Sequence, residues 1–181
     1  MKKDRNSIFC ATNSLKILSF LVDNPTKEFM GREIQKSTHI SRAGIYLALQ
    51  ELVKNNLVHR TYKGKFLIYS AAYDNPAVKQ FKILRNVLLL HAAVAKLSVS
   101  SKRIVLYGSA SRGEDDSSSD IDLFVLSQTP DTVKEVLALL RLKRKIQAVV
   151  KTPAEIPELQ EKDKVFWGEV ERGIVLWEEK E

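Results

Sequence analysis

The chain has 181 residues, of which 44% are hydrophobic, and its single cysteine, Cys10, excludes an intramolecular disulfide. The charged N-terminus is not followed by an apolar region, and we find no run that approaches the ~18 apolar residues of a spanning helix. We therefore expect a cytoplasmic protein of one or two domains with no membrane partner.

Charge is divided unevenly along the chain. Residues 1–100 contain 16 Lys+Arg and 6 Asp+Glu, a net charge of +10, while residues 101–181 contain 13 and 16, a net charge of −3, which together give +7. A basic half indicates contact with a polyanion such as nucleic acid. Lysines that only keep a small domain soluble are the alternative, and charge alone does not separate the two.

Two helices are predicted at the start of the basic half. Asn13 is the expected N-cap of the first, and this helix ends before Asn24-Pro25. The second is short and covers residues 30–37.

A third helix is predicted to begin after Ser41, which is its expected N-cap. Its buried face carries apolar residues at helical spacing: Ile45, Leu49 and Leu52. Its opposite face carries polar side chains: Arg42, Tyr46 and Gln50.

A basic β-hairpin is predicted next, over residues 57–69, with the turn Lys63-Gly64-Lys65 at its tip. Three helices followed by such a hairpin resemble a winged helix-turn-helix, although only the order of elements is matched. The resemblance implies a double-stranded DNA partner, with the third helix in the major groove and the hairpin on the backbone; protein docking is the alternative. The implied contact residues are Ser41, Arg42, Tyr46, Gln50, Arg60, Lys63 and Lys65.

Asn75-Pro76 is predicted to begin a longer helix that extends to about Leu97. Its apolar stripe either packs on a sheet of the same chain or forms a homodimer. The resulting boundaries are 1–75 for the DNA-binding domain, 76–98 for the linking helix and 99–181 for a second domain.

The second domain contains the motif with the most chemical content. Gly108-Ser109 follows an apolar strand predicted over residues 104–107, and a glycine there lets backbone N–H groups approach a phosphate oxygen. A second strand is predicted from Ile121, and its period of two places Asp120 and Asp122 on one face. Carboxylates about 4 Å apart repel by roughly 4 kcal/mol at an effective dielectric near 20, so the pair needs a proton or a cation. Magnesium or manganese carrying a nucleoside triphosphate meets that need.

Ten residues separate Gly108-Ser109 from Asp120. This spacing, with Arg112-Gly113 and the core Ser119-Asp120-Ile121-Asp122-Leu123, resembles the signature of the DNA polymerase β-like nucleotidyltransferases, especially the minimal type, over about residues 85–181. The resemblance implies a mixed α/β (α+β) domain with a small mixed sheet. It also implies nucleotide-binding residues Gly108, Ser109 and Arg112, and catalytic, metal-binding residues Asp120 and Asp122.

One expected residue of that superfamily is missing. The resemblance implies a third carboxylate on the next core strand, which we predict over residues 145–150, but the corresponding position holds Gln147. A neutral amide accepts a hydrogen bond but cannot act as a base. Glu155 is the nearest later acid, and it is predicted to begin a helix rather than to replace the third ligand.

Three functions remain open at this point. The chain could transfer a nucleoside monophosphate to a hydroxyl acceptor. It could be a DNA-binding regulator whose degenerate nucleotidyltransferase domain senses a nucleotide, which Gln147 favours. Finally, the resemblance to minimal nucleotidyltransferases that act as antitoxins suggests transfer to a partner toxin protein.

Overall fold

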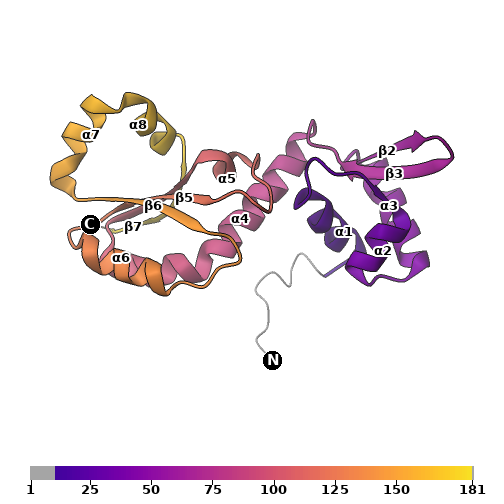
Figure 1. Cartoon of the computed structure of the whole chain (residues 1–181), viewed down its shortest axis with the longest axis horizontal. Helices are drawn as coiled ribbons and strands as arrows, with labels where there is room; N and C mark the ends of the chain where they lie inside the picture. Colours follow the sequence, from indigo (N-terminus) through magenta and orange to yellow (C-terminus); the bar gives the residue numbers. More distant parts are fainter. Residues whose placement is uncertain (1–10, 181) are drawn as a thin grey trace. The chain divides into compact units, whose positions relative to one another are not determined.

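The computed structural model describes residues 11–180, so Cys10 and the charged N-terminus lie outside the described residues. The chain divides into two compact units, one extending to Arg85 and one beginning at Asn86 (Figure 1). The helix α4 (Pro76–Leu97) contains this boundary, and the predicted helix from Pro76 to about Leu97 is confirmed.

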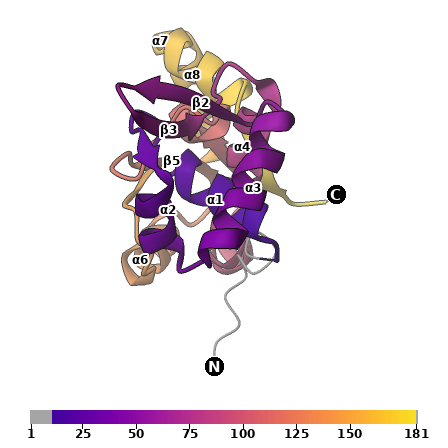
Figure 2. The ribbon, with the colours of Figure 1, turned by 90° about the vertical axis from the view of Figure 1, so that its right-hand side faces the viewer.

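The first unit combines helices with a three-stranded antiparallel sheet of order β1-β3-β2. Figure 2 labels its helices α1, α2 and α3 and the two long strands β2 and β3. Its elements before α4 are α1 (Asn13–Val22), β1 (Phe29–Met30), α2 (Gly31–Thr38), α3 (Arg42–Lys54), β2 (Val58–Lys63) and β3 (Phe66–Ala71). Helices and sheet enclose one apolar core, which includes Ile17, Leu21, Ile34, Ile45, Leu49 and Leu52. The predicted succession of three helices and a hairpin is therefore present.

The helix caps of this unit follow the sequence closely, with one shift. Thr12, and not Asn13, precedes α1, and its hydroxyl accepts a hydrogen bond from the backbone N–H of Leu15 at 3.2 Å. Both residue types cap helices, so propensity alone does not distinguish adjacent candidates. Ser41 caps α3 as predicted, because its hydroxyl accepts from the N–H of Gly44 at 3.2 Å.

The hairpin closes through a two-residue loop. Lys63 pairs with Phe66 across the strands, which leaves Gly64 and Lys65 in the loop. Gly64 has a φ of +60°, a left-handed conformation at the first loop position that glycine adopts without steric cost.

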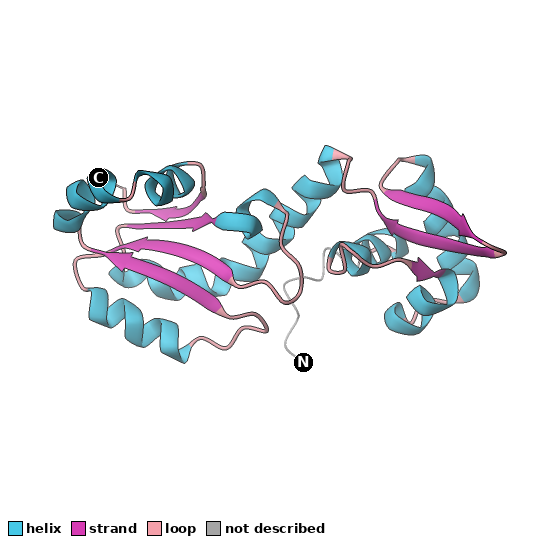
Figure 3. Ribbon diagram, turned by 45° about the horizontal axis from the view of Figure 1, so that its top comes forward, coloured by secondary structure: helices cyan, strands magenta, loops and turns pink. Residues whose placement is uncertain are grey.

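The second unit is built on a four-stranded mixed sheet of order β6-β5-β4-β7. Strands β5 and β6 are parallel, and the other neighbours are antiparallel (Figure 3). Its elements after α4 are η2 (Ser98–Ser100), β4 (Arg103–Tyr107), α5 (Gly108–Arg112), β5 (Ile121–Leu126), α6 (Pro130–Leu139), β6 (Ile146–Lys151), η3 (Pro153–Glu155), α7 (Ile156–Lys162), α8 (Lys164–Glu171) and β7 (Ile174–Glu178). The predicted small mixed sheet is thus observed.

Helices cover both faces of this sheet. On one face, α4 and α6 contribute Leu90, Leu97 and Val133 to a core with alternate residues of β4 and β5. On the other face, Val170 of α8 packs on Val105 and Phe124, and Ile156 and Leu159 of α7 pack against them. Figure 1 shows α7 and α8 together on this side of the sheet. Since successive residues of a strand face opposite sides of the sheet, the central strands β4 and β5 each contribute side chains to both cores.

The apolar character of α4 corrects one sequence expectation. The segment Pro76–Ser100 is long and apolar enough to cross a membrane by length and composition, because a window of 18 residues within it has a mean hydropathy of 1.4. The expectation that no segment has the length and apolar character of a spanning helix is therefore wrong. A single such helix is weak evidence for a span, because a core helix meets the same criterion, and in α4 Leu90 and Leu97 are fully buried against the sheet.

Phe124 provides a test of the second core. Its buried ring lies 5.8 Å from the ring of Trp167, centroid to centroid. Phe124→Ala is expected to lower the free energy of unfolding by about 3–5 kcal/mol through the cavity it leaves. Both tryptophans, Trp167 and Trp177, belong to this unit, so their fluorescence during urea unfolding reports on it. Val165→Ala, at an exposed position of α8, is the control, and an equal loss in both variants would contradict this packing.

Candidate functional site

The candidate site of the second unit lies at one end of its sheet, where β4 ends and β5 begins. The antiparallel register pairs Tyr107 with Asp122, and the parallel register pairs Asp122 with Gln147. Register partners on adjacent strands project from the same face of a sheet. Tyr107, Asp122 and Gln147 therefore share the face that α7 and α8 cover further along.

Gly108 lies directly against this row. Its φ of +68° is left-handed, and a β-carbon built there would overlap Oδ2 of Asp122. Both observations require glycine at this position. The backbone at the start of α5 thus approaches the Asp122 carboxylate more closely than any side chain would permit.

Asp120 and Asp122 repel each other. Burial raises the pKa of Asp122, the negative charge of Asp120 raises it further, and the Arg144 guanidinium lowers it in part. The nearest recorded cation to the Asp120 carboxylate is the exposed Lys145 ammonium, at 3.8 Å between Nζ and Oδ2. A like-charge pair that Arg144 and Lys145 offset only in part suits one divalent cation together with phosphate oxygens.

Tyr107 is a neighbour of this pair that sequence reasoning missed. Burial first, and then the charge of Asp122, raise its pKa to about 12. The phenol therefore keeps its proton at neutral pH and remains a hydrogen-bond donor. Its ring packs edge-on against Phe166 at 5.4 Å. The strand alternation that placed Asp122 would also have indicated Tyr107.

Gln147 occupies the position that the sequence predicts for it, beside Asp122 on the next strand, and its side chain is exposed. Glu155 does not join the pair. Its carboxylate accepts from the N–H and the hydroxyl of Thr152, both at 2.8 Å, and from Lys151 at 2.8 Å. These hydrogen bonds lower its pKa to about 2. Among residues 11–180, no cluster of three or more His, Cys, Asp or Glu side chains could hold a metal.

Arg112 already has two carboxylate partners. Its Nε lies 3.0 Å from Glu114, and its Nη1 lies 2.6 Å from Glu169 of α8. These hydrogen bonds raise the pKa of the guanidinium. Binding of a phosphate by Arg112 would have to replace or share these contacts.

A buried ion pair fixes the loop that leads to the aspartates. Asp115 is 1% exposed and Arg144 12%, and their closest oxygen and nitrogen are 2.5 Å apart. The same guanidinium donates to the backbone carbonyls of Ser119 at 2.8 Å and Asp120 at 3.1 Å. Asn86 of α4 donates to Asp115 and to the carbonyl of Ala110, both at 2.9 Å.

In the sequence, Arg144 stands among three cations that are exposed in the structure, Arg141, Lys143 and Lys145. Arg144 lies just before β6 and reaches 29 positions back along the chain to Asp115. No local pattern predicts a contact at that separation.

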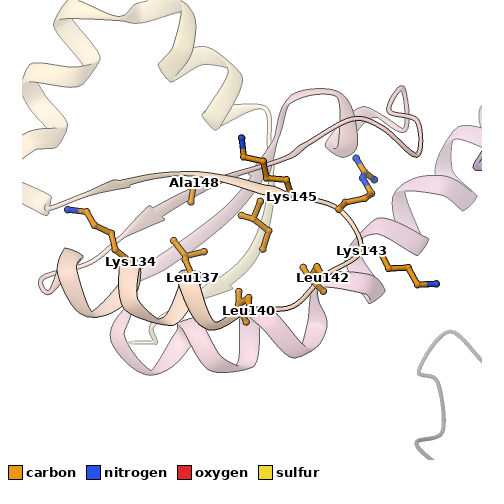
Figure 4. Close-up of a pocket in the computed structure, with 9 residues that line it drawn as sticks. Lys134, Leu137, Leu140, Leu142, Lys143, Lys145 and Ala148 are labelled. Carbon is orange, nitrogen blue, oxygen red and sulfur yellow. The ribbon is translucent and has the colours of Figure 1, made fainter.

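A cavity of about 580 Å³ lies between α6 and β6 in the same unit (Figure 4). Leucine side chains form its floor, and Lys134, Lys143 and Lys145 extend from its rim. Ile146 and Ala148 line it, so it opens on the opposite face of β6 from Gln147. Its apolar lining thus lies away from the aspartate pair, although two of its lining cations, Arg144 and Lys145, also approach Asp120.

The candidate DNA-contacting residues lie on the surface of the first unit. On α3, Arg42, Tyr46 and Gln50 are exposed, and Gln50 donates a hydrogen bond to the Tyr46 hydroxyl at 2.7 Å. Ser41 is occupied by its capping role. The hairpin exposes its candidate cations, Arg60, Lys63 and Lys65, and Lys63 forms an ion pair with Glu28.

Comparison with known proteins gives one match. Residues 93–181, slightly under half of the chain, match the family model described as polymerase beta, nucleotidyltransferase. This supports a polymerase β-like nucleotidyltransferase domain in that part, and it suggests nucleotidyl transfer at the level of the family. No significant match was found among the curated proteins or among the solved structures.

The raised pKa of Asp122 predicts how stability depends on pH. A carboxyl whose pKa is higher in the folded than in the unfolded state stabilises the fold below the unfolded pKa, and this contribution is lost as pH rises through the folded pKa. With a chelator present, Asp122→Asn should therefore unfold at a higher urea concentration than the parent at about pH 7, and the difference should disappear near pH 3.

Asp116 offers a control of opposite sign. Hydrogen bonds from Ser118 and Ser119 lower the pKa of Asp116, so its charged form stabilises the fold. Asp116→Asn should lower the urea midpoint at about pH 7. A lower midpoint in Asp122→Asn as well would contradict the repulsion between the paired aspartates.

The buried ion pair yields a second prediction. Arg144→Ala leaves the Asp115 carboxylate buried without its guanidinium, and it should cost about 3–5 kcal/mol of unfolding free energy, measured by urea titration. Arg144→Lys keeps the charge but loses the fork of donors, so it should recover only part of the loss. Arg141→Ala, at an exposed position in the same loop, is the control. Equal stabilities of the two alanine variants would show that the pair does not fix the loop.

Proposed function

We propose that the second unit binds a nucleoside triphosphate with magnesium or manganese and transfers a nucleoside monophosphate to a hydroxyl acceptor. The observation that carries the proposal is the position of Gly108, where a β-carbon would overlap the Asp122 carboxylate, next to Asp120. The family match over residues 93–181 supports the class of reaction.

Asp120 and Asp122 would hold the metal ion, which would neutralise charge on the triphosphate and on the departing pyrophosphate. Two carboxylates fit one such ion, since magnesium is commonly held by one or two carboxylates and takes further oxygens from phosphates and water. The repulsion that raises the pKa of Asp122 favours the same occupant.

The other residues of the site bind and orient the substrate. Backbone N–H groups at Gly108 and Ser109 would bind a phosphate oxygen, and Arg112 would offset negative charge once it leaves Glu114 or Glu169. In the transfer, a bond forms between the acceptor oxygen and the α-phosphorus. The bond between the α-phosphorus and the oxygen that bridges to the β-phosphorus breaks, and pyrophosphate leaves. The acceptor proton passes to solvent, because Gln147 cannot take it.

Gln147 supports a second candidate function in a different class. A site without the third carboxylate could bind the triphosphate and report on it without turnover. The first unit would then bind double-stranded DNA through α3 and the hairpin, as the net charge of +10 over residues 1–100 suggests, and the chain would act as a cytoplasmic regulator. A partner toxin protein as the hydroxyl acceptor remains the third candidate.

Label transfer separates these candidates. Purified protein is incubated with each α-³²P-labelled triphosphate and magnesium, with and without cell lysate, and products are resolved by electrophoresis. We expect a labelled acceptor that is lost in Asp120→Asn and in Asp122→Asn, and Gln147→Asp should increase the label by restoring a third carboxylate.

The controls make the outcome decisive. Glu155→Gln removes a nearby carboxylate whose hydrogen bonds are local to η3, so it should leave label transfer unchanged. No label in any lysate, with magnesium-dependent triphosphate binding intact, would replace the transferase by the nucleotide-sensing candidate. Label that persists in both aspartate variants would contradict the site.

A further inference from the structure

The first unit contains a groove of about 790 Å³ between α3, the start of α2 and the hairpin. Its floor is apolar and is formed by Met30, Ile45, Leu49 and Leu67. Its walls carry aromatic rings: Tyr46, Tyr62, Phe66 and Tyr69. All of its lining residues belong to the first unit, and none of them belongs to the aspartate site.

The aromatic rings on the rim of the groove are exposed to solvent. Tyr62 is 73% exposed, Tyr46 63% and Phe66 48%. Tyr46 and Tyr62 are close enough to the Tyr69 hydroxyl to influence its pKa. Burial is the main cause that raises the pKa of Tyr69, and the charge of Arg60 lowers it while both tyrosines raise it. Aromatic rings from the helix and from the hairpin therefore surround one concave surface.

The charges at this groove have one sign. Arg32, Arg42 and Lys65 line it, and among the described residues its lining contains no carboxylate. No ion pair within 4 Å is recorded for these three cations in residues 11–180. Lys65 instead lies over the Phe66 ring, 5.8 Å from its centroid. The groove therefore combines rings for stacking with cations for a backbone of phosphates.

A base-paired duplex uses only part of this surface. Its bases are stacked on one another, and its outer surface is polar, so it cannot cover an apolar floor of Ile45, Leu49 and Leu67. An unpaired base presents a flat apolar face to an aromatic ring, and successive bases can stack while cations follow the phosphates. We propose that this groove binds single-stranded nucleic acid, through stacking on Tyr46, Tyr62 and Phe66 and phosphate contacts with Arg32, Arg42 and Lys65.

This inference rests on the nucleic-acid-binding part of the proposed function and refines its ligand. The test uses the full chain and fluorescence anisotropy with a labelled oligothymidine of about 15 nucleotides, an oligouridine of the same length and the matching DNA duplex. We expect at least tenfold tighter binding to a single strand than to the duplex. The logarithm of affinity should fall against the logarithm of salt with a slope of about −2, for three phosphates at about 0.7 each.

Substitutions then test stacking. Tyr62→Ala should weaken binding of the single strand by roughly tenfold or more, whereas Tyr62→Phe, which keeps the ring, should stay within about twofold of the parent. Leu47→Ala removes an exposed apolar side chain of α3 that does not line the groove, and it should have no effect. Both tyrosine variants should leave duplex binding unchanged.

The outcomes distinguish this inference from the broader proposal. Preferential duplex binding that Tyr62→Ala does not alter would overturn the single-strand inference and leave double-stranded DNA as the ligand. Absence of salt-dependent binding to all three probes would overturn both, and it would make the groove a protein-docking surface. Comparison of oligothymidine with oligouridine assigns the ligand to DNA or RNA.

Discussion

The repulsion between two aspartate carboxylates is the constraint around which the second unit is arranged. Asp120 and Asp122 are separated by one residue at the start of β5, so strand geometry holds them together whether or not a cation is present. Like charges held this way raise the cost of the folded state until a cation or proton neutralises them. Two apolar cores and a buried ion pair stabilise the second unit and offset this repulsion.

The Arg144–Asp115 pair shows how that stability reaches the site. The guanidinium donates to the buried Asp115 carboxylate and to the consecutive carbonyls of Ser119 and Asp120, so one side chain fixes both ends of the loop. It also lowers the pKa of Asp122 in part, which moderates the repulsion without removing it. Gly108 completes the arrangement by bringing the backbone against Asp122 where a side chain would not fit. The placement and the charge of the two aspartates thus depend on residues from α4, α5, β5 and the loop before β6.

Sequence reasoning was most successful where the chemistry is local. The strand from Ile121 to Leu126, the helix from Pro76 and the cap at Ser41 follow from alternation, a helix-starting proline and a capping residue. The position of Gln147 beside Asp122 was also predictable, because the family resemblance implies a third site position on the next core strand, and the observed register agrees. The role of Arg144 was not, since its partner lies 29 residues away and the residue stands in a run of surface cations. The contact of Arg112 with Glu169 was equally hidden, because the two residues are 57 positions apart and meet only once α8 packs on the sheet.

The central claim is that the aspartate pair holds a divalent cation together with a triphosphate. The most direct measurement is electron paramagnetic resonance of manganese, titrated into the protein with and without a non-hydrolysable nucleoside triphosphate. One bound manganese ion per chain should appear when the triphosphate is present, and replacing both aspartates by alanine should abolish it. Equal binding of manganese by the parent and by the double variant, in the presence of the triphosphate, would contradict the claim.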